Sequence, residues 1–381
     1  MSIYLDNNAT THIDPVVLDE MLPYLRDNFG NPSSIHSHGR EAKLGMDIAR
    51  ERVADLIGAQ PEEIIFTSSG TESANQALTG VLKARRTVGA HLIVSSIEHQ
   101  AILNTAHFLE MEGASTSYLP VDADGVVSVQ ALKDVARKDT VLVSIMTANN
   151  DVGTLQPIGE LTKISRKLGI TFHTDAVQAV GKIPVEVSSF GVDLLSFSAH
   201  KIHGPKGVGA LYVKAGTRVS SFIHGGHQES RRRAGTENVA GIVGFGKACE
   251  LASDRLKKDS ARISALRDNF ETDLLQNLDG LVIHGPQNTR LPGTSNISFL
   301  GIEGETLLMA LDLAGVSAST GSACTSDNST FSHVLAAMGC EPAIAISSVR
   351  FSFGRENDQT QMEQTVATIK QTVARLRKAY Q

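Results

Sequence analysis

Residues 194–207 read Leu-Leu-Ser-Phe-Ser-Ala-His-Lys-Ile-His-Gly-Pro-Lys-Gly. The apolar part predicts a buried strand that ends at Ser198, and a Gly-Pro turn follows it. Lys201 therefore lies at the edge of a core strand. Desolvation lowers the pKa of an amine and makes it a nucleophile toward carbonyl carbons, so Lys201 is a candidate Schiff-base former. The alternative is a lysine whose stem covers the strand end while its amine reaches solvent.

The composition indicates a globular protein and excludes several functional classes. The chain has 381 residues, of which 41% are hydrophobic and 20% charged, with a formal net charge of −6. This length exceeds one ordinary core, so we expect two domains. A negative net charge gives no general attraction to nucleic acid or to anionic membranes. The first residues lack a signal-peptide pattern, and no apolar run reaches the roughly 20 residues of a membrane span. We expect a cytoplasmic protein that contacts neither nucleic acid nor a membrane.

The cysteines indicate reactivity rather than a disulfide framework. Cys249, Cys324 and Cys340 are the three cysteines, and they are widely spaced and odd in number. Free thiols of this kind persist in a reducing compartment. Cys324 lies in a small, polar, Gly-containing stretch that is typical of an exposed loop, where a thiol can react. Cys249 lies within a helical apolar pattern and, like Cys340, is expected to be structural.

Two histidine pairs have a spacing that is compatible with zinc. They are His200 with His203, and His224 with His227. Neither pair is accompanied by a cysteine or acidic pattern that would complete a ligand set. We therefore predict no metal.

Strands and helices alternate from residue 63 onward. The expected strands are 64–67, 91–95, 116–121, 140–147, 170–173, 193–198 and 208–213, and the expected helices between them are 71–86, 100–112, 129–138 and 158–168. This alternation predicts right-handed crossovers and a mainly parallel sheet with helices on both faces, an α/β fold. A long helix at 239–278 then leads to a smaller α+β region. We predict a large domain at 15–255 and a small domain formed by 1–14 and 256–381.

Polar residues follow the predicted strands at their carboxyl ends. After the first strand, Thr-Ser-Ser-Gly-Thr-Glu (67–72) opens a helix, which suits a phosphate but equally suits an ordinary helix cap. Later strands are followed by Glu98, His99, Asn149, Asn150, Asp175 and Gln178. Any one of these alone is typical of a solvated loop. Because ligands on parallel sheets bind at the carboxyl ends of the strands, their recurrence predicts one pocket that includes Lys201 and suits pyridoxal 5′-phosphate.

The chain resembles the cysteine desulfurases of the NifS/IscS type, within the class V aminotransferase family. The resemblance spans nearly the whole chain and rests on an ordered set of segments. These are residues 4–11, 30–34, 70–73, 98–99, 149–150, 173–178, 196–201, 204–207, 233–238, 321–325 and 349–352. It implies the type I fold of pyridoxal-phosphate-dependent transferases and the conversion of L-cysteine to L-alanine in a homodimer. The sulfur would pass as a persulfide to an acceptor protein, either an Fe–S scaffold or a tRNA thiolase.

The same resemblance implies residue roles. Lys201 would hold the cofactor and move the Cα proton, His99 would stack on the ring and transfer protons, and Cys324 would carry the persulfide. The other implied cofactor ligands are Gly70, Thr71, Ser198 and His200 at the phosphate, Asp175 at the pyridine nitrogen, Asn150 and Gln178 at the phenolic oxygen, and Thr236 at the phosphate across the dimer interface. Arg350, assisted by Asn31, would bind the substrate carboxylate.

Some residues depart from the family pattern, and other functions compete with this one. Asp151 stands where a glutamate is usual, His227 where a glycine is usual, and residues 327–331 lack the usual proline. The nearest alternatives are a selenocysteine lyase and a class V aminotransferase, the second of which has no need of Cys324. A protein that keeps the fold for binding alone, without chemistry, is an alternative of a different class.

Overall fold

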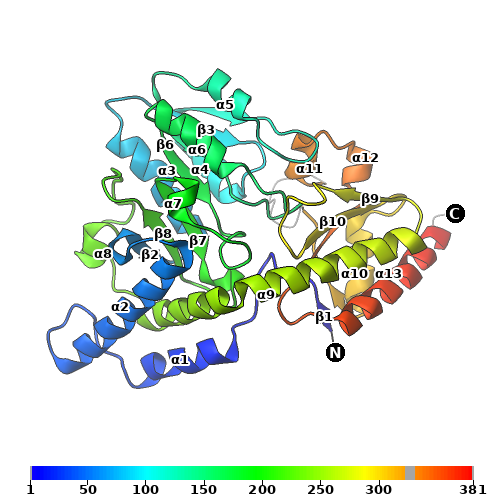
Figure 1. Cartoon of the computed structure of the whole chain (residues 1–381), viewed down its shortest axis with the longest axis horizontal. Helices are drawn as coiled ribbons and strands as arrows, with labels where there is room; N and C mark the ends of the chain where they lie inside the picture. Colours follow the sequence, from blue (N-terminus) through cyan, green and yellow to red (C-terminus); the bar gives the residue numbers. More distant parts are fainter. Residues whose placement is uncertain (1, 322–330, 380–381) are drawn as a thin grey trace.

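The computed structural model describes residues 2–321 and 331–379, and its largest element is a seven-stranded sheet (Figure 1). The strand order is β2-β8-β7-β6-β5-β3-β4. Their bounds are β2 (Ile64–Thr67), β3 (His91–Ser95), β4 (Ser115–Leu119), β5 (Thr140–Ser144), β6 (Thr171–Asp175), β7 (Leu194–Ser198) and β8 (Gly209–Val213). Strand β8 is antiparallel to both of its neighbours, β2 and β7, and the other adjacent pairs of this sheet are parallel. The predicted mainly parallel sheet is confirmed.

Helices cover both faces of this sheet, because successive strand residues point to opposite sides. On β3, Leu92 belongs to a hydrophobic cluster with residues of α3 and α4, whereas Ile93 belongs to another, which includes residues of α2, α6 and α9. The helices of this part are α1 (Pro15–Arg26), α2 (Ser37–Ile57), α3 (Gly70–Ala84), α4 (Gln100–Met111), α5 (Val129–Val135), α6 (Ile158–Lys167), α7 (Val187–Phe190), α8 (Gln228–Arg231) and α9 (Val239–Asn277). The result is a three-layer α/β arrangement, as predicted.

A second core lies at the far end of the long helix α9 (Figure 1). Its antiparallel sheet has the order β12-β10-β9. The elements are β9 (Leu281–His284), β10 (Thr294–Phe299), α10 (Gly304–Leu313), β11 (Val316–Ser317), α11 (His333–Ala337), α12 (Pro342–Ala345), β12 (Ser348–Ser352) and α13 (Gln359–Ala379). The N-terminal strand β1 (Ile3–Tyr4) pairs with β11, so the first residues join this core. The boundary between 255 and 256 stays a prediction.

The ends of two elements have a local cause. Helix α2 begins at Ser37, where the imidazole of His36 accepts a hydrogen bond from the backbone of Gly39 and caps the helix. Strand β6 extends beyond 173 to Asp175, because Asp175 pairs with Ser196 of β7. The carboxylate of Asp175 therefore belongs to the strand end and not to the following loop.

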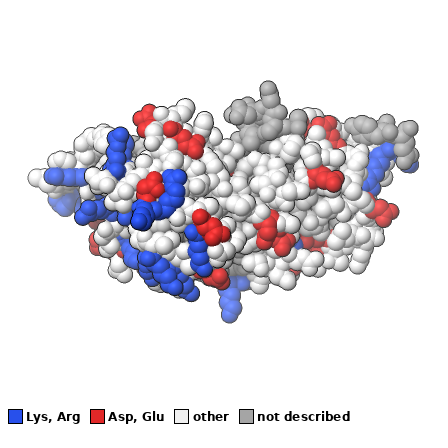
Figure 2. All heavy atoms as spheres, turned by 90° about the horizontal axis from the view of Figure 1, so that it is seen from above, with Lys and Arg blue, Asp and Glu red and all other residues white. Residues whose placement is uncertain are grey.

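The surface carries charges of both signs. On the face shown in Figure 2, Lys and Arg side chains gather toward one end, with Asp and Glu side chains among them. Within residues 2–321 and 331–379, no helix has both the length and the hydrophobicity needed to cross a membrane.

We expect Phe270→Ala to destabilise the second core severely. Phe270 of α9 is fully buried, and its ring centroid lies 5.2 Å from that of Phe351 and 5.1 Å from that of Phe353. Removing such a ring costs about 3–5 kcal/mol of unfolding free energy, measured by urea denaturation. Leu275→Ala, on the exposed side of the same helix, is the control and should cost less than about 0.5 kcal/mol. Equal losses in the two variants would contradict this account of the core.

Candidate functional site

A cavity of about 430 Å³ lies at the carboxyl ends of the parallel strands, where the sequence predicted a pocket. Most of the predicted site residues line it together. They are Gly70, Thr71, His99, Asn150, Asp175, Gln178, Ser198, His200, Lys201 and Arg350. The cavity size is within the range of small-molecule sites. Residues separated by up to 344 positions, Asp6 and Arg350, thus line one cavity.

Two predicted site residues, Asn31 and Thr236, do not line this cavity, and a third cannot be placed. Asn31 is exposed, and its side-chain oxygen accepts a hydrogen bond from the backbone of Ser33 at 2.9 Å. Thr236 is exposed in the loop before α9, so its predicted role, toward a partner subunit, stays a prediction. Cys324 lies outside the described residues.

The phosphate end of the predicted site is built on the first turn of α3. Ser69 caps this helix by accepting a hydrogen bond from Glu72 N, and the first N–H groups of a helix have no partner within it. A Cβ on Gly70 would lie 2.7 Å from Val177 Cγ2, so only glycine allows this close approach. Burial, followed by the charge of Lys201, lowers the pKa of His200 to about 4. A neutral imidazole and a helix N-terminus are suitable donors to a phosphate.

The ring end of the predicted site contains a buried carboxylate. Asp175 accepts a hydrogen bond from Val177 N at 2.9 Å and forms no ion pair with any described residue. Burial raises the pKa of Asp175, although the charges of His99 and Lys201 act in the opposite direction. A protonated ring nitrogen would add a cation that pairs directly with this carboxylate. The donor set therefore fits pyridoxal 5′-phosphate.

His99 lies beside this carboxylate at the start of α4. Its Nδ1 accepts a hydrogen bond from Ala101 N at 3.1 Å, which leaves the proton of the neutral ring on Nε2. Burial lowers the pKa of His99, although the charge of Asp175 acts in the opposite direction. The imidazole is therefore held neutral and in one tautomer, as a proton acceptor and donor requires.

Lys201 is held by an N-terminal arm, which we define as residues 5–11. Lys201 Nζ donates to the carbonyl oxygens of Asn8 and Ala9, at 2.7 Å in each case. The arm is fixed in turn by Thr11, whose N–H and hydroxyl both donate to the carbonyl of His200. The structure thus positions the amine by backbone hydrogen bonds that the strand pattern did not indicate.

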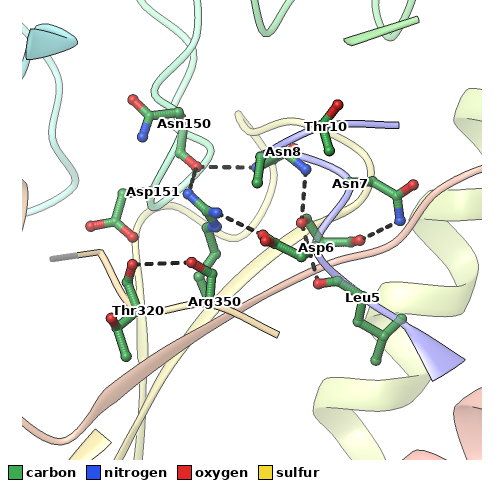
Figure 3. A network of polar contacts seen from close by, with 12 residues as sticks. Leu5, Asp6, Asn7, Asn8, Thr10, Asn150, Asp151, Thr320 and Arg350 are labelled. Carbon is green, nitrogen blue, oxygen red and sulfur yellow. Dashed lines mark hydrogen bonds and ion pairs between the residues drawn. The ribbon is translucent and has the colours of Figure 1, made fainter. Parts of the chain in front are cut away.

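Arg350 of β12 contributes the cationic side of the cavity (Figure 3). Its guanidinium donates to Asp6 Oδ1 at 2.8 Å and to the carbonyl of Asn150 at 3.1 Å. Its Nε is buried and has no partner among the described residues. A substrate carboxylate would therefore compete with Asp6 for this guanidinium.

Asp151, one of the departures from the family pattern, has a structural role in the described chain. Its Oδ1 accepts from Asn296 at 2.8 Å, and its Oδ2 accepts from the hydroxyl of Ser332. A Cβ on Gly321 would clash with the same carboxylate. Asp151 therefore joins the loop after β5 to residues on either side of the segment that contains Cys324.

Sequence reasoning assigned no role to four residues that surround the site: Asp6, Asn8, Glu98 and Lys182. Asp6 and Asn8 lie in residues 4–11, a segment that carries the family resemblance, but no role was predicted for either. Glu98 is fully buried; its Oε1 accepts from Ser95 Oγ and from Met146 N, and its Oε2 has no partner among the described residues. Burial raises the pKa of Glu98 to about 8. A glutamate directly after an apolar strand was the available signal.

We expect Glu98→Gln to stabilise the apoprotein increasingly as pH rises. The pKa of Glu98 is higher in the folded protein than in the unfolded chain, so the folded protein keeps a proton that the unfolded chain loses. The free energy of unfolding of the wild type therefore falls as pH rises from the unfolded pKa to the folded pKa. Glutamine cannot ionise, so the advantage of the variant should grow from about pH 5 to about pH 8 and reach about 3 kcal/mol near neutrality. Urea unfolding at several pH values measures it, with the exposed Glu112→Gln as control. A difference that is independent of pH would contradict a neutral Glu98.

The sequence is similar to those of known proteins over nearly the whole chain. The family described as Aminotransferase class-V matches residues 3–365. A protein of Dictyoglomus turgidum named cysteine desulfurase IscS is 50% identical over 375 residues, which are 98% of this chain and 95% of that protein. One of the same name from Methanosarcina thermophila is 46% identical over 376 residues, which are 99% of this chain and 93% of that protein.

Solved structures agree as well. One described as a NifS-like protein has a TM-score of 0.93 at 41% identity, covering 98% of this chain and 100% of that chain. A NifS-like protein from Rickettsia africae has a TM-score of 0.89 at 33% identity, with the same coverage. The chain belongs to the class-V aminotransferase family and, within it, to the pyridoxal-phosphate-dependent cysteine desulfurases.

Proposed function

We propose that this chain breaks the C–S bond of L-cysteine, transfers the sulfur to the thiol of Cys324 and releases L-alanine. The observation that carries the proposal is the meeting of Lys201, Asp175, His99 and Arg350 around one cavity. The reaction balances: the Cys324 thiol and L-cysteine become a Cys324 persulfide and L-alanine. One C–S bond breaks, one S–S bond forms, and a proton is added to the former Cβ.

Three residues of the cavity, Asp175, Lys201 and His99, act in the chemical steps of this proposal. When bound, pyridoxal 5′-phosphate supplies an electron sink for the negative charge that develops at Cα. Asp175 keeps the ring nitrogen protonated, and Lys201 removes the Cα proton. His99 is neutral and close enough to Asp175 and Lys201 for their charges to act on its pKa, so it can relay protons.

The substrate carboxylate has a binding partner in Arg350. The unpartnered Nε and the nitrogen that bonds Asp6 offer two N–H groups on one edge of the guanidinium. Arginine binds carboxylates through such paired donors. We propose that Asp6 holds the guanidinium in place until the substrate arrives.

A homodimer is supported by exposed apolar side chains on two neighbouring N-terminal helices. Leu18, Leu22 and Leu25 form a stripe on α1, and Leu44 and Ile48 form another on α2. A monomeric soluble protein rarely leaves such stripes uncovered. We propose that a second copy of the chain covers these two stripes, and that Thr236 of each copy reaches the cavity of the other.

The sulfur acceptor is a protein, in this proposal, and both an Fe–S scaffold and a tRNA thiolase remain candidates. We place the reaction in the cytoplasm, where reduced thiols persist. This is supported by Cys249 and Cys340, which are both free thiols.

Burial raises the pKa of the thiols of Cys249 and Cys340, which makes both of them poor nucleophiles.

The test is a single incubation of purified protein with L-cysteine and a thiol reductant, in which alanine and sulfide are both quantified. We expect equal amounts from the wild type. Cys324→Ser should lose about 100-fold or more of the activity while keeping the cofactor absorbance, because serine cannot accept the sulfur. Cys340→Ser is the matched control and should keep its activity. Full desulfuration by Cys324→Ser would assign the protein to the lyases or aminotransferases instead.

A further inference from the structure

We propose that Lys182 is a positioning residue, which fixes the amide of Gln178 so that Gln178 donates a hydrogen bond into the cavity. The inference rests on the proposed function, since it concerns the residue expected at the phenolic oxygen of the cofactor. Lys182 itself does not line that cavity. It lines a smaller one of about 70 Å³, which shares Lys201 with the first.

Gln178 and Lys182 lie four residues apart in the turns that follow β6. Lys182 Nζ donates to Gln178 Oε1 at 2.7 Å. With Lys182 as the donor, the amide oxygen of Gln178 faces Lys182 and the amide nitrogen faces away. Gln178 Nε2 indeed donates to the carbonyl of Asn8 at 2.8 Å.

This arrangement determines what Gln178 offers to a ligand. An amide nitrogen carries two N–H groups, and one of them is used by Asn8. The second is available to the cavity, of which Gln178 forms part of the wall. A phenolic oxygen is an acceptor, so it needs this donor. Without Lys182, the amide could rotate and present an acceptor in the same place.

Lys182 also fixes the segment that holds the reactive amine. Its Nζ donates to Asn8 Oδ1 at 3.0 Å, and the carbonyl of Asn8 accepts from both Gln178 and Lys201. One residue of the N-terminal arm is therefore shared by the two lysines and the amide. Burial, then the charges of Lys201 and Arg350, lower the pKa of Lys182 to about 7. A neutral amine keeps two N–H groups, so Lys182 can donate to Gln178 Oε1 and Asn8 Oδ1 in either protonation state.

The experiment is a double-mutant cycle on the apoprotein with pyridoxine 5′-phosphate. This compound has the phosphate, the ring nitrogen and the phenolic oxygen but no aldehyde, so it reports non-covalent binding. We expect Lys182→Met to raise the dissociation constant of pyridoxine 5′-phosphate about tenfold, as measured by calorimetry. In a Gln178→Ala background, the same substitution should change it less than about twofold, because Lys182 acts through Gln178.

Lys206→Met is the matched control, since Lys206 is exposed although its charge also acts on His200. It should change the constant less than about twofold in both backgrounds. If Lys182→Met lowers the affinity for pyridoxine 5′-phosphate equally in the wild-type and Gln178→Ala backgrounds, Lys182 has a merely structural role and the inference is wrong. The inference is also wrong if Lys182→Met does not lower the affinity at all.

If Lys182→Met does not fold, Lys182→Arg, which keeps N–H donors, decides instead. Binding within about threefold of the wild type supports the inference, and a loss of about tenfold overturns it. Wild-type apoprotein that does not bind pyridoxine 5′-phosphate would overturn the proposed function itself. The two failures are therefore distinguishable.

Discussion

The polar groups of the cavity depend on the parallel pairing of β5, β6 and β7, because parallel strands end at the same edge of a sheet. In the observed register, Asp175 lies opposite Ser196. A shift of one residue would turn its carboxylate to the other face of the sheet. The apolar residues on both faces oppose such a shift, since each face is covered by helices. The hydrophobic pattern thus determines where the polar groups of the cavity lie.

The N-terminal arm completes the site from a distant part of the chain. It begins beside the second core, where β1 pairs with β11, and reaches the cavity through Asp6, Asn8 and Ala9. Asp6 holds Arg350, and the carbonyls of Asn8 and Ala9 hold Lys201 (Figure 3 shows the contacts of Asp6 and Asn8). Buried polar groups are costly without partners, so this network favours one arrangement of the two cores.

The sequence was informative wherever a local pattern carries the signal. Short apolar runs that alternate with helical patterns predicted the sheet and most of its helices, and the position of polar residues after strands predicted the cavity around Lys201 and Asp175. Contacts that join distant residues could not be predicted in this way. Asp6 meets Arg350 across 344 positions and Lys182 meets Asn8 across 174, and no local periodicity reports either pair. The environment of Glu98 was missed for the same reason, since its carboxylate accepts a hydrogen bond from Met146 N, 48 positions away.

The central claim is that the amine of Lys201, and no other, carries the cofactor. Reduction of the purified protein with borohydride makes a lysine-bound cofactor permanent, and peptide mass spectrometry then identifies the modified residue. The account predicts a phosphopyridoxyl group on the peptide that contains Lys201. Its presence on Lys182, the other amine close to the cavity, or its absence from the whole chain would contradict the assignment.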